Sequence, residues 1–100
     1  MKAEMFNYHI WISYTDPTNI VGSMENILTE SGFTLINFVE HHFHPIGYTC
    51  LWLLGESHAA IHTFPEEEKI YIEVSSCVEK YLEQFIEKFE LYFKNDLLMI

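Results

Sequence analysis

The sequence predicts an α+β two-layer sandwich, in which two helices pack on one face of an antiparallel sheet of four or five strands. Five short runs are rich in β-branched and aromatic residues, as strands are, and two stretches repeat apolar residues at helical spacing. Their order along the chain is β-α-β-β-β-β-α, and such consecutive strands favour antiparallel pairing. With 100 residues and 49% hydrophobic content, residues 1–100 are expected to form a single domain.

The first strand and the first helix are separated by a clear turn signal. The stretch FNYHIWISY (6–14) reads as a strand and ends shortly before Asp16 and Pro17. In the helix that follows, Asp16 or Thr18 can cap the start, and Gly32 suits a left-handed stop. The apolar residues at helical spacing are Ile20, Val21, Met24, Ile27 and Leu28.

The next two strands are predicted to form a hairpin. They are FTLINFVEHHF (33–43) and YTCLWLLG (48–55), and the residues Pro45-Ile46-Gly47 between them are typical of a turn.

Two shorter strands follow, HAAIHT (58–63) and KIYIEVS (69–75), on either side of Pro65 and a run of three glutamates. In the second of them, apolar and other residues alternate, which indicates one covered face and one face that is solvated or lines a site. The alternating sets are Ile70, Ile72 and Val74 against Tyr71, Glu73 and Ser75.

The last element is predicted to be an amphipathic helix. Ser76 and Glu79 have the spacing of a capping box, which would place Cys77 in the first helical turn. There the helix dipole would favour a thiolate. The apolar stripe consists of Val78, Tyr81, Leu82, Phe85, Ile86, Phe89, Tyr92 and Phe93. With both helices on one face, the other sheet face is left for a site, a dimer contact or both.

Composition narrows the possible partners. A formal charge of −10 with only five Lys and Arg argues against nucleic acid and favours cations as small partners. No signal-peptide pattern and no apolar run of about 18 residues is present, so we expect a cytoplasmic protein with no membrane partner. Without an export signal, Cys50 and Cys77 are expected to be two thiols rather than a disulfide.

Reactive side chains gather in residues 55–77, where Ser57, two histidines and Cys77 lie among five carboxylates. Taken singly, each has an ordinary structural interpretation, such as a turn serine or a strand histidine. A hydrolase nucleophile elbow is disfavoured because the second glycine after Ser57 is absent. We predict no metal site, because no CxxC or HExxH spacing is present. The histidines weighed for zinc are His41, His42, His44, His58 and His62.

Taken together, these residues have a recognisable pattern. ESHAAIHTFPE (56–66), followed by a cysteine 20 positions after the serine, closely resembles the S-adenosylmethionine decarboxylase proenzymes of the small bacterial and archaeal type. That family reads ESH, two variable residues, IHT, an aromatic residue and PE. The upstream stretch HHFHPIGYT (41–49) fits the family at the same spacing, without a gap through Cys77.

The resemblance implies a self-processing enzyme. The Ser57 hydroxyl would attack the carbonyl of Glu56, exchanging the amide for an ester. Elimination from the ester would leave dehydroalanine at position 57, which would tautomerise and hydrolyse to a pyruvoyl group derived from Ser57. The chain would thereby be cut into residues 1–56 and 57–100. His62 matches the histidine that assists the elimination. We expect it to reach Ser57 across a tight turn into the strand, with Thr49 as the neighbouring hydroxyl.

The resemblance also implies roles in decarboxylation. The pyruvoyl ketone would capture the substrate amine as a Schiff base and accept the electrons released with carbon dioxide. Cys77 matches the proton donor, and Phe43 matches an aromatic residue that stacks on adenine, although a core role for Phe43 stays open. Glu66 matches a carboxylate suited to ribose hydroxyls or a cationic amine. Two departures from the family are Thr49 in place of serine and Val78 in place of glycine.

Three functions remain open at this level. The favoured one is decarboxylation of S-adenosylmethionine in polyamine (spermidine) biosynthesis by a homodimer of processed protomers. The second keeps the pyruvoyl chemistry with a basic amino acid, ornithine or arginine, as substrate. The third is an unprocessed relative without enzymatic activity.

Overall fold

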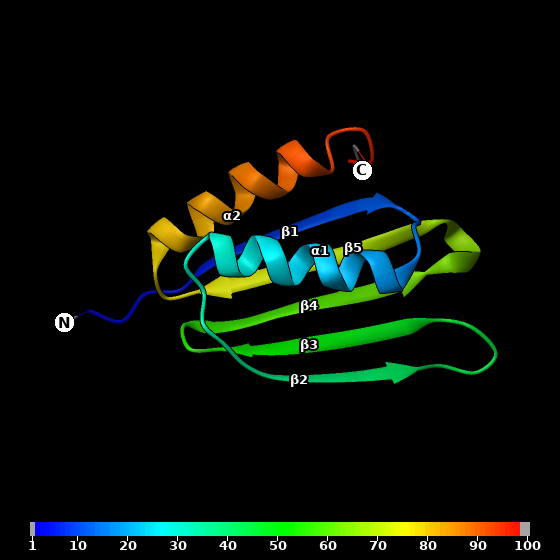
Figure 1. Ribbon diagram of the computed structural model, residues 1–100, viewed down its shortest axis with the longest axis horizontal. Coiled ribbons are helices and arrows are strands. Elements are labelled where there is room, and N and C mark those ends of the chain that lie inside the picture. Colours follow the sequence, from blue (N-terminus) through cyan, green and yellow to red (C-terminus); the bar gives the residue numbers. More distant parts are fainter. Residues whose placement is uncertain (1, 99–100) are drawn as a thin grey trace.

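The computed structural model describes residues 2–98 and forms a five-stranded antiparallel sheet with two helices on one face (Figure 1). Met1, Met99 and Ile100 lie outside the described residues. The predicted fold class and element order are confirmed. In chain order the elements are β1 (Phe6–Ser13), α1 (Pro17–Glu30), β2 (Leu35–His42), β3 (Tyr48–Leu54), β4 (Ser57–Phe64), the 3-10 turn η1 (Pro65–Glu67), β5 (Lys69–Ser76) and α2 (Glu79–Tyr92).

The strands lie in the order β1-β5-β4-β3-β2. Strands β2 to β5 follow one another as a meander, and β1 pairs with the outer side of β5. The connections between the strands lie at two opposite ends of the sheet (Figure 1). The β3–β4 turn and the connection from β5 to α2 lie at one end, and the β2–β3 and β4–β5 connections lie at the other.

Every second side chain along the strands points toward the helices, and these side chains form the buried face of the sheet. Trp52 is 1% exposed, and its indole N–H donates to the Glu25 carboxylate of α1 at 2.9 Å. Burying each large apolar side chain stabilises the fold by about 1.5 to 3 kcal/mol, which holds both helices on this face. The core of strand residues consists of Ile12, Cys50, Trp52, Ala59, Ile61, Ile70, Ile72 and Val74, and the helices add Ile20, Met24, Leu28, Phe85 and Phe89.

Because side chains alternate along a strand, the intervening residues point away from the helices. We call this second surface the open face. Its residues include His9 and Trp11 of β1, Val39 of β2, Thr49, Leu51 and Leu53 of β3, His58 and His62 of β4, and Tyr71 and Glu73 of β5.

Helix α1 begins and ends as the sequence predicts. Of the two caps considered, Asp16 is the N-cap, and its carboxylate accepts a hydrogen bond from the Thr18 N–H at 2.9 Å. Gly32 follows the last turn with a φ of +110°. A β-carbon at this position would lie 2.8 Å from the Tyr81 ring, so the close approach of α2 also requires glycine.

The predicted start of α2 is wrong. Ser76 is the last residue of β5, where it pairs with Phe6 and Ser57, and these sheet contacts keep its backbone extended. Its hydroxyl accepts a hydrogen bond from the Val78 N–H at 2.9 Å, so it does not cap the helix through a capping box with Glu79. Cys77 therefore lies in the connection before α2, and the argument from the helix dipole does not apply to it.

The predicted apolar stripe of α2 is buried at Leu82, Phe85, Phe89 and Phe93. Tyr92 is an exception, with 65% of its surface exposed. It lies beside α1, where the Ser23 hydroxyl donates to its phenol oxygen at 3.2 Å. Within residues 2–98, no helix is long and apolar enough to span a membrane.

Candidate active site

The turn between β3 and β4 holds the two residues of the expected cleavage. Glu56 lies in the turn, and Ser57 is the first residue of β4. The backbone N–H of Cys77 donates to the carbonyl oxygen of Glu56 at 3.0 Å. That carbonyl is the one that the Ser57 hydroxyl would attack, so the N–H is placed to stabilise negative charge that develops on its oxygen.

This turn is held in place by Thr34, the residue before β2. The Glu56 carboxylate accepts hydrogen bonds from the Thr34 N–H at 3.1 Å and from the Thr34 hydroxyl at 3.2 Å. The Gly55 N–H donates to the Thr34 carbonyl at 2.9 Å. Ser57 itself has a φ of 156°, a positive value that is uncommon for a residue with a β-carbon. Sequence reasoning missed Thr34, because no motif links it to Glu56 across 22 positions.

His58 lies directly against Ser57. Its Nδ1 is 3.1 Å from the Ser57 hydroxyl oxygen, and the imidazole is exposed on the open face. Beside it is an apolar hollow of about 310 Å³, whose lining includes Val39, Leu51 and Leu53. We call Glu56, Ser57, His58 and Cys77 the scissile cluster. Sequence reasoning treated His58 as an ordinary strand histidine, although its position next to Ser57 was a signal that could have marked it.

A second group, which we call the His62 cluster, consists of Thr49, His62, Tyr71 and Glu73. Thr49 and His62 are direct partners in the β3–β4 register, with 3.1 Å between the Thr49 hydroxyl oxygen and Nδ1 of His62. On the other side of His62 lies the Tyr71 ring, whose hydroxyl donates to Glu73 at 3.0 Å. Burial and this hydrogen bond raise the pKa of Tyr71, so the phenol stays protonated.

The two clusters do not meet within one chain. Ser57 and His62 belong to one continuous strand, so the expectation of a tight turn between them is wrong. Five residues at a rise of about 3.3 Å separate them by about 16 Å along the strand. The expectation that Thr49 neighbours Ser57 is also wrong, because Thr49 pairs with His62.

Phe43 and Glu66 lie at the end of the sheet opposite Ser57 (Figure 1). Phe43 is 50% exposed and contacts the His41 ring, with 4.6 Å between the centroids, which excludes a core role. It lines a hollow of about 380 Å³ together with Tyr48 and Pro65. Glu66 follows Pro65 in η1 and is exposed.

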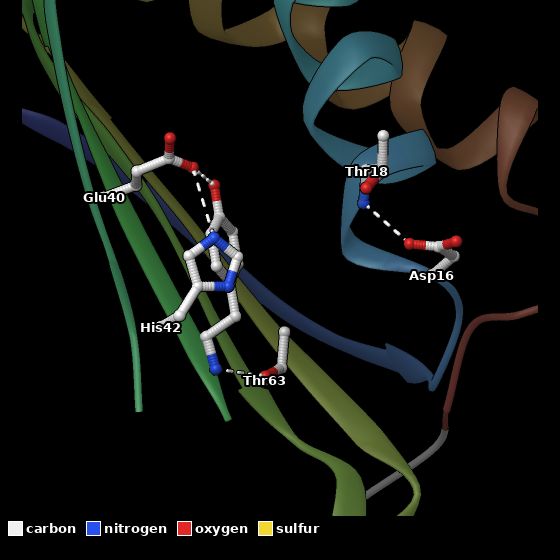
Figure 2. A network of polar contacts seen from close by, with 6 residues as sticks. Asp16, Thr18, Glu40, His42 and Thr63 are labelled. Atoms are coloured by element: carbon white, nitrogen blue, oxygen red, sulfur yellow. Dashed lines mark hydrogen bonds and ion pairs between the residues drawn. The ribbon is translucent and has the colours of Figure 1, made fainter. Parts of the chain in front are cut away.

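A polar network fixes this end of the sheet (Figure 2). The Tyr48 hydroxyl donates to Glu40 at 2.6 Å, and the Tyr48 N–H donates to the Thr63 hydroxyl at 2.8 Å. Glu40 also lies 4.0 Å from Nε2 of His42. Burial, together with the hydrogen bond to Glu40, raises the pKa of Tyr48, so the phenol remains a donor. The loop that carries Phe43 therefore begins and ends on anchored strands.

The two cysteines are free thiols, as predicted, and they differ in accessibility. Cys50 is buried under the helices, and burial raises the pKa of its thiol to about 12. Cys77 is exposed beside the β3–β4 turn, so it is the more accessible of the two thiols. Among residues 2–98, no group of three or more His, Cys, Asp or Glu side chains could hold a metal ion.

A solved structure has the same architecture. The crystal structure of the adenosylmethionine decarboxylase from Aquifex aeolicus superposes with a TM-score of 0.75 at 21% sequence identity. The match covers 94% of this chain and 83% of that one. At this identity it establishes the shared fold.

Sequence comparisons lead to the same family. An S-adenosylmethionine decarboxylase proenzyme of Prochlorococcus marinus is 47% identical over 47 residues, which are 47% of this chain and 38% of that protein. Another, from Archaeoglobus fulgidus, is 33% identical over 72 residues, which are 67% of this chain and 64% of that protein. Both alignments thus span less than two thirds of the relative. The family model described as S-adenosylmethionine decarboxylase matches residues 12–98, which include both clusters, Phe43 and Glu66, and the chain therefore belongs to the S-adenosylmethionine decarboxylase family.

Proposed function

We propose that the chain is the proenzyme of a pyruvoyl-dependent S-adenosylmethionine decarboxylase of polyamine (spermidine) biosynthesis. It activates itself by cleavage between Glu56 and Ser57, giving chains 1–56 and 57–100. The observation that carries this proposal is the Cys77 N–H, 3.0 Å from the Glu56 carbonyl oxygen at a turn followed directly by Ser57. The names of the relatives, which are proenzymes, support the same chemistry.

The fold can tolerate this cut. Strand β3 is paired with β2 on one side and β4 on the other, and β4 is paired with β3 and β5. Thr34 donates two hydrogen bonds to the side-chain carboxylate of Glu56, and cleavage of the backbone after Glu56 leaves these two bonds in place. Both fragments therefore stay in one sheet after cleavage, and the new amino-terminal group at position 57 stays beside Cys77.

The pyruvoyl group formed from Ser57 would supply a ketone that takes up the substrate amine and accepts the electrons released with carbon dioxide. The residues around position 57 fit this group. The Cys77 N–H provides a donor toward the position of the scissile carbonyl, and the exposed Cys77 thiol provides a proton for the substrate carbon. Cys77 thus acts twice, through its backbone in cleavage and through its side chain in turnover.

The site is completed by a second copy of the chain. Val39, Leu51 and Leu53 are 60, 44 and 53% exposed on the open face, an apolar surface that favours burial against a partner. When two open faces pack about a two-fold axis, the His62 end of one sheet can cover the Ser57 end of the other.

In this homodimer, His62 and Thr49 of one copy assist the elimination at Ser57 of the other copy. Phe43 then stacks on the substrate adenine, and Glu66 binds the ribose hydroxyls or the amine. The substrate carries a cationic sulfonium, which suits a chain with a formal charge of −10. We place the enzyme in the cytoplasm, where this substrate is used.

Mass spectrometry of the intact protein tests the proposal. The wild type should give fragments of about 6.5 and 5 kDa, in proportion to the 11.9 kDa of the chain, with the second blocked to Edman sequencing. Ser57→Ala should stay whole. Release of carbon dioxide from S-adenosylmethionine, and not from ornithine or arginine, should follow cleavage. A wild type that stays whole for days at neutral pH would instead identify an unprocessed relative.

A further inference from the structure

The first step of cleavage needs a base. A serine hydroxyl is a weak nucleophile until a group within hydrogen-bond reach takes its proton. His62 is about 16 Å from Ser57 along the strand, so it does not serve this step within the chain. The family resemblance gives His62 a later role in the elimination and leaves the deprotonation of Ser57 without an assigned residue.

We propose that His58 is the base that deprotonates Ser57 in the first step, an inference that rests on the proposed self-cleavage. Its Nδ1 lies 3.1 Å from the Ser57 hydroxyl oxygen, within the range for direct proton transfer. With the ring proton on Nε2, Nδ1 carries a lone pair and accepts the hydrogen bond from the hydroxyl.

The other polar groups nearby already have partners. The Glu56 carboxylate accepts both hydrogen bonds from Thr34. The hydroxyl of Ser76, which pairs with Ser57 across the sheet, is bonded to Val78.

The strand neighbours of His58 do not compete with Ser57 for a hydrogen bond to Nδ1 of the imidazole. Its partners on the adjacent strands are Leu53 and Ser75, neither of which is charged. The Ser75 hydroxyl donates to Asn7 of β1 in a short hydrogen bond. The hollow on the remaining side is lined mainly by apolar residues and leaves the imidazole accessible from solvent.

The step is balanced within the protein. The Ser57 hydroxyl gives its proton to Nδ1 of His58, and its oxygen bonds to the carbonyl carbon of Glu56. The Cys77 N–H stabilises the resulting oxyanion. When the carbon–nitrogen bond breaks, the imidazolium returns the proton to the Ser57 nitrogen. The product is an ester with a free amine, and no other reactant is used.

The two histidines act at different stages: His58 acts before the ester forms, and His62 acts after it has formed. Neutral hydroxylamine distinguishes these stages, because it cuts esters and leaves ordinary amides intact. His58→Ala should form the ester at least about 100-fold more slowly than wild type, the usual contribution of a general base. The variant should therefore stay whole with and without hydroxylamine. His62→Ala should stay whole alone and be cut between Glu56 and Ser57 by hydroxylamine.

Controls separate chemistry from folding. Added imidazole should restore cleavage of His58→Ala, because removal of the ring leaves space for it beside the Ser57 hydroxyl, and should not affect Ser57→Ala. His58→Gln, which can hydrogen-bond but is a poor base, should also stay whole and match Ser57→Ala in circular dichroism and thermal melting. His42→Ala removes an exposed histidine at the other end of the sheet and should cleave like the wild type.

Three results would overturn the inference. They are cleavage of His58→Ala at the wild-type rate, an ester in His58→Ala that hydroxylamine cuts, and a folded His58→Ala that imidazole does not restore. In each case the wild type is still cleaved, so the proposed function survives. A wild type that stays whole removes the proposed function itself.

Discussion

Cleavage at Ser57 should depend on His62 of a second copy of the chain rather than on His62 of the same chain. The separation of about 16 Å along β4 is more than five times the roughly 3 Å that proton transfer requires. Bringing the two residues together within one chain would require β4 to leave both β3 and β5, and thus to lose two ladders of backbone hydrogen bonds. Two copies packed by their open faces avoid this cost.

The test is to co-express Ser57→Ala with His62→Ala, each with a different affinity tag. Each variant alone should stay whole. In random dimers, about half of the His62→Ala chains have a Ser57→Ala partner, which supplies an intact His62. About half of the His62→Ala chains should therefore be cut between Glu56 and Ser57, and no Ser57→Ala chain should be cut.

The matched control is co-expression of His62→Ala with the double variant Ser57→Ala/His62→Ala, which forms the same dimers without an intact His62 and should give no cleavage. Sequential purification on the two tags shows whether mixed dimers exist. If mixed dimers are recovered and every His62→Ala chain in them is whole, while the wild type is cleaved, the shared site is refuted. A fully cleaved His62→Ala homodimer would remove His62 from processing altogether.

Three further outcomes are expected. Cys77→Ala should still be cleaved, because its backbone N–H is retained, but turnover should divert into transamination and inactivate the enzyme; unchanged turnover without inactivation removes Cys77 as proton donor. Phe43→Ala should weaken S-adenosylmethionine binding by about 1 to 3 kcal/mol with little change in Tm, because the ring is 50% exposed. Leu91→Ala on α2, 69% exposed, is its control, and lost stability with intact affinity would contradict the stacking role. Burial raises the pKa of the Cys50 thiol from 9.0 to about 12, so the folded state favours the protonated thiol. The contribution of this thiol to the free energy of unfolding is therefore complete below pH 9 and is lost as pH rises toward 12. In urea unfolding, the free energy of unfolding of the wild type should fall by up to about 1.4 kcal/mol per pH unit in this window, and that of Cys50→Ala should fall less. An equal dependence on pH in the two proteins would contradict this role of Cys50.

The sequence by itself determined the fold class and the order of the elements. Apolar residues at helical spacing in α1 and α2, and alternation in β5, are local patterns that one segment displays without reference to the rest of the chain. The residues from Glu56 to Glu66, with Cys77 after them, likewise identified the family, because a motif is a property of consecutive positions. Where a local signal competed with the sheet, as at the Ser76 capping box, the pairing of Ser76 in β5 decided the conformation.

Only the tertiary structure decided which reactive groups meet. Strand register is set by hydrogen bonds between segments distant in sequence, and a one-residue change would move every side chain to the other face. The observed register joins Thr49 to His62, separates both from Ser57, and brings the Cys77 N–H onto the Glu56 carbonyl. The hydrogen-bonding partners of Ser57 and of Glu56 depend on that same packing, because the position of Thr34 and the orientation of His58 follow from how the strands lie in the sheet.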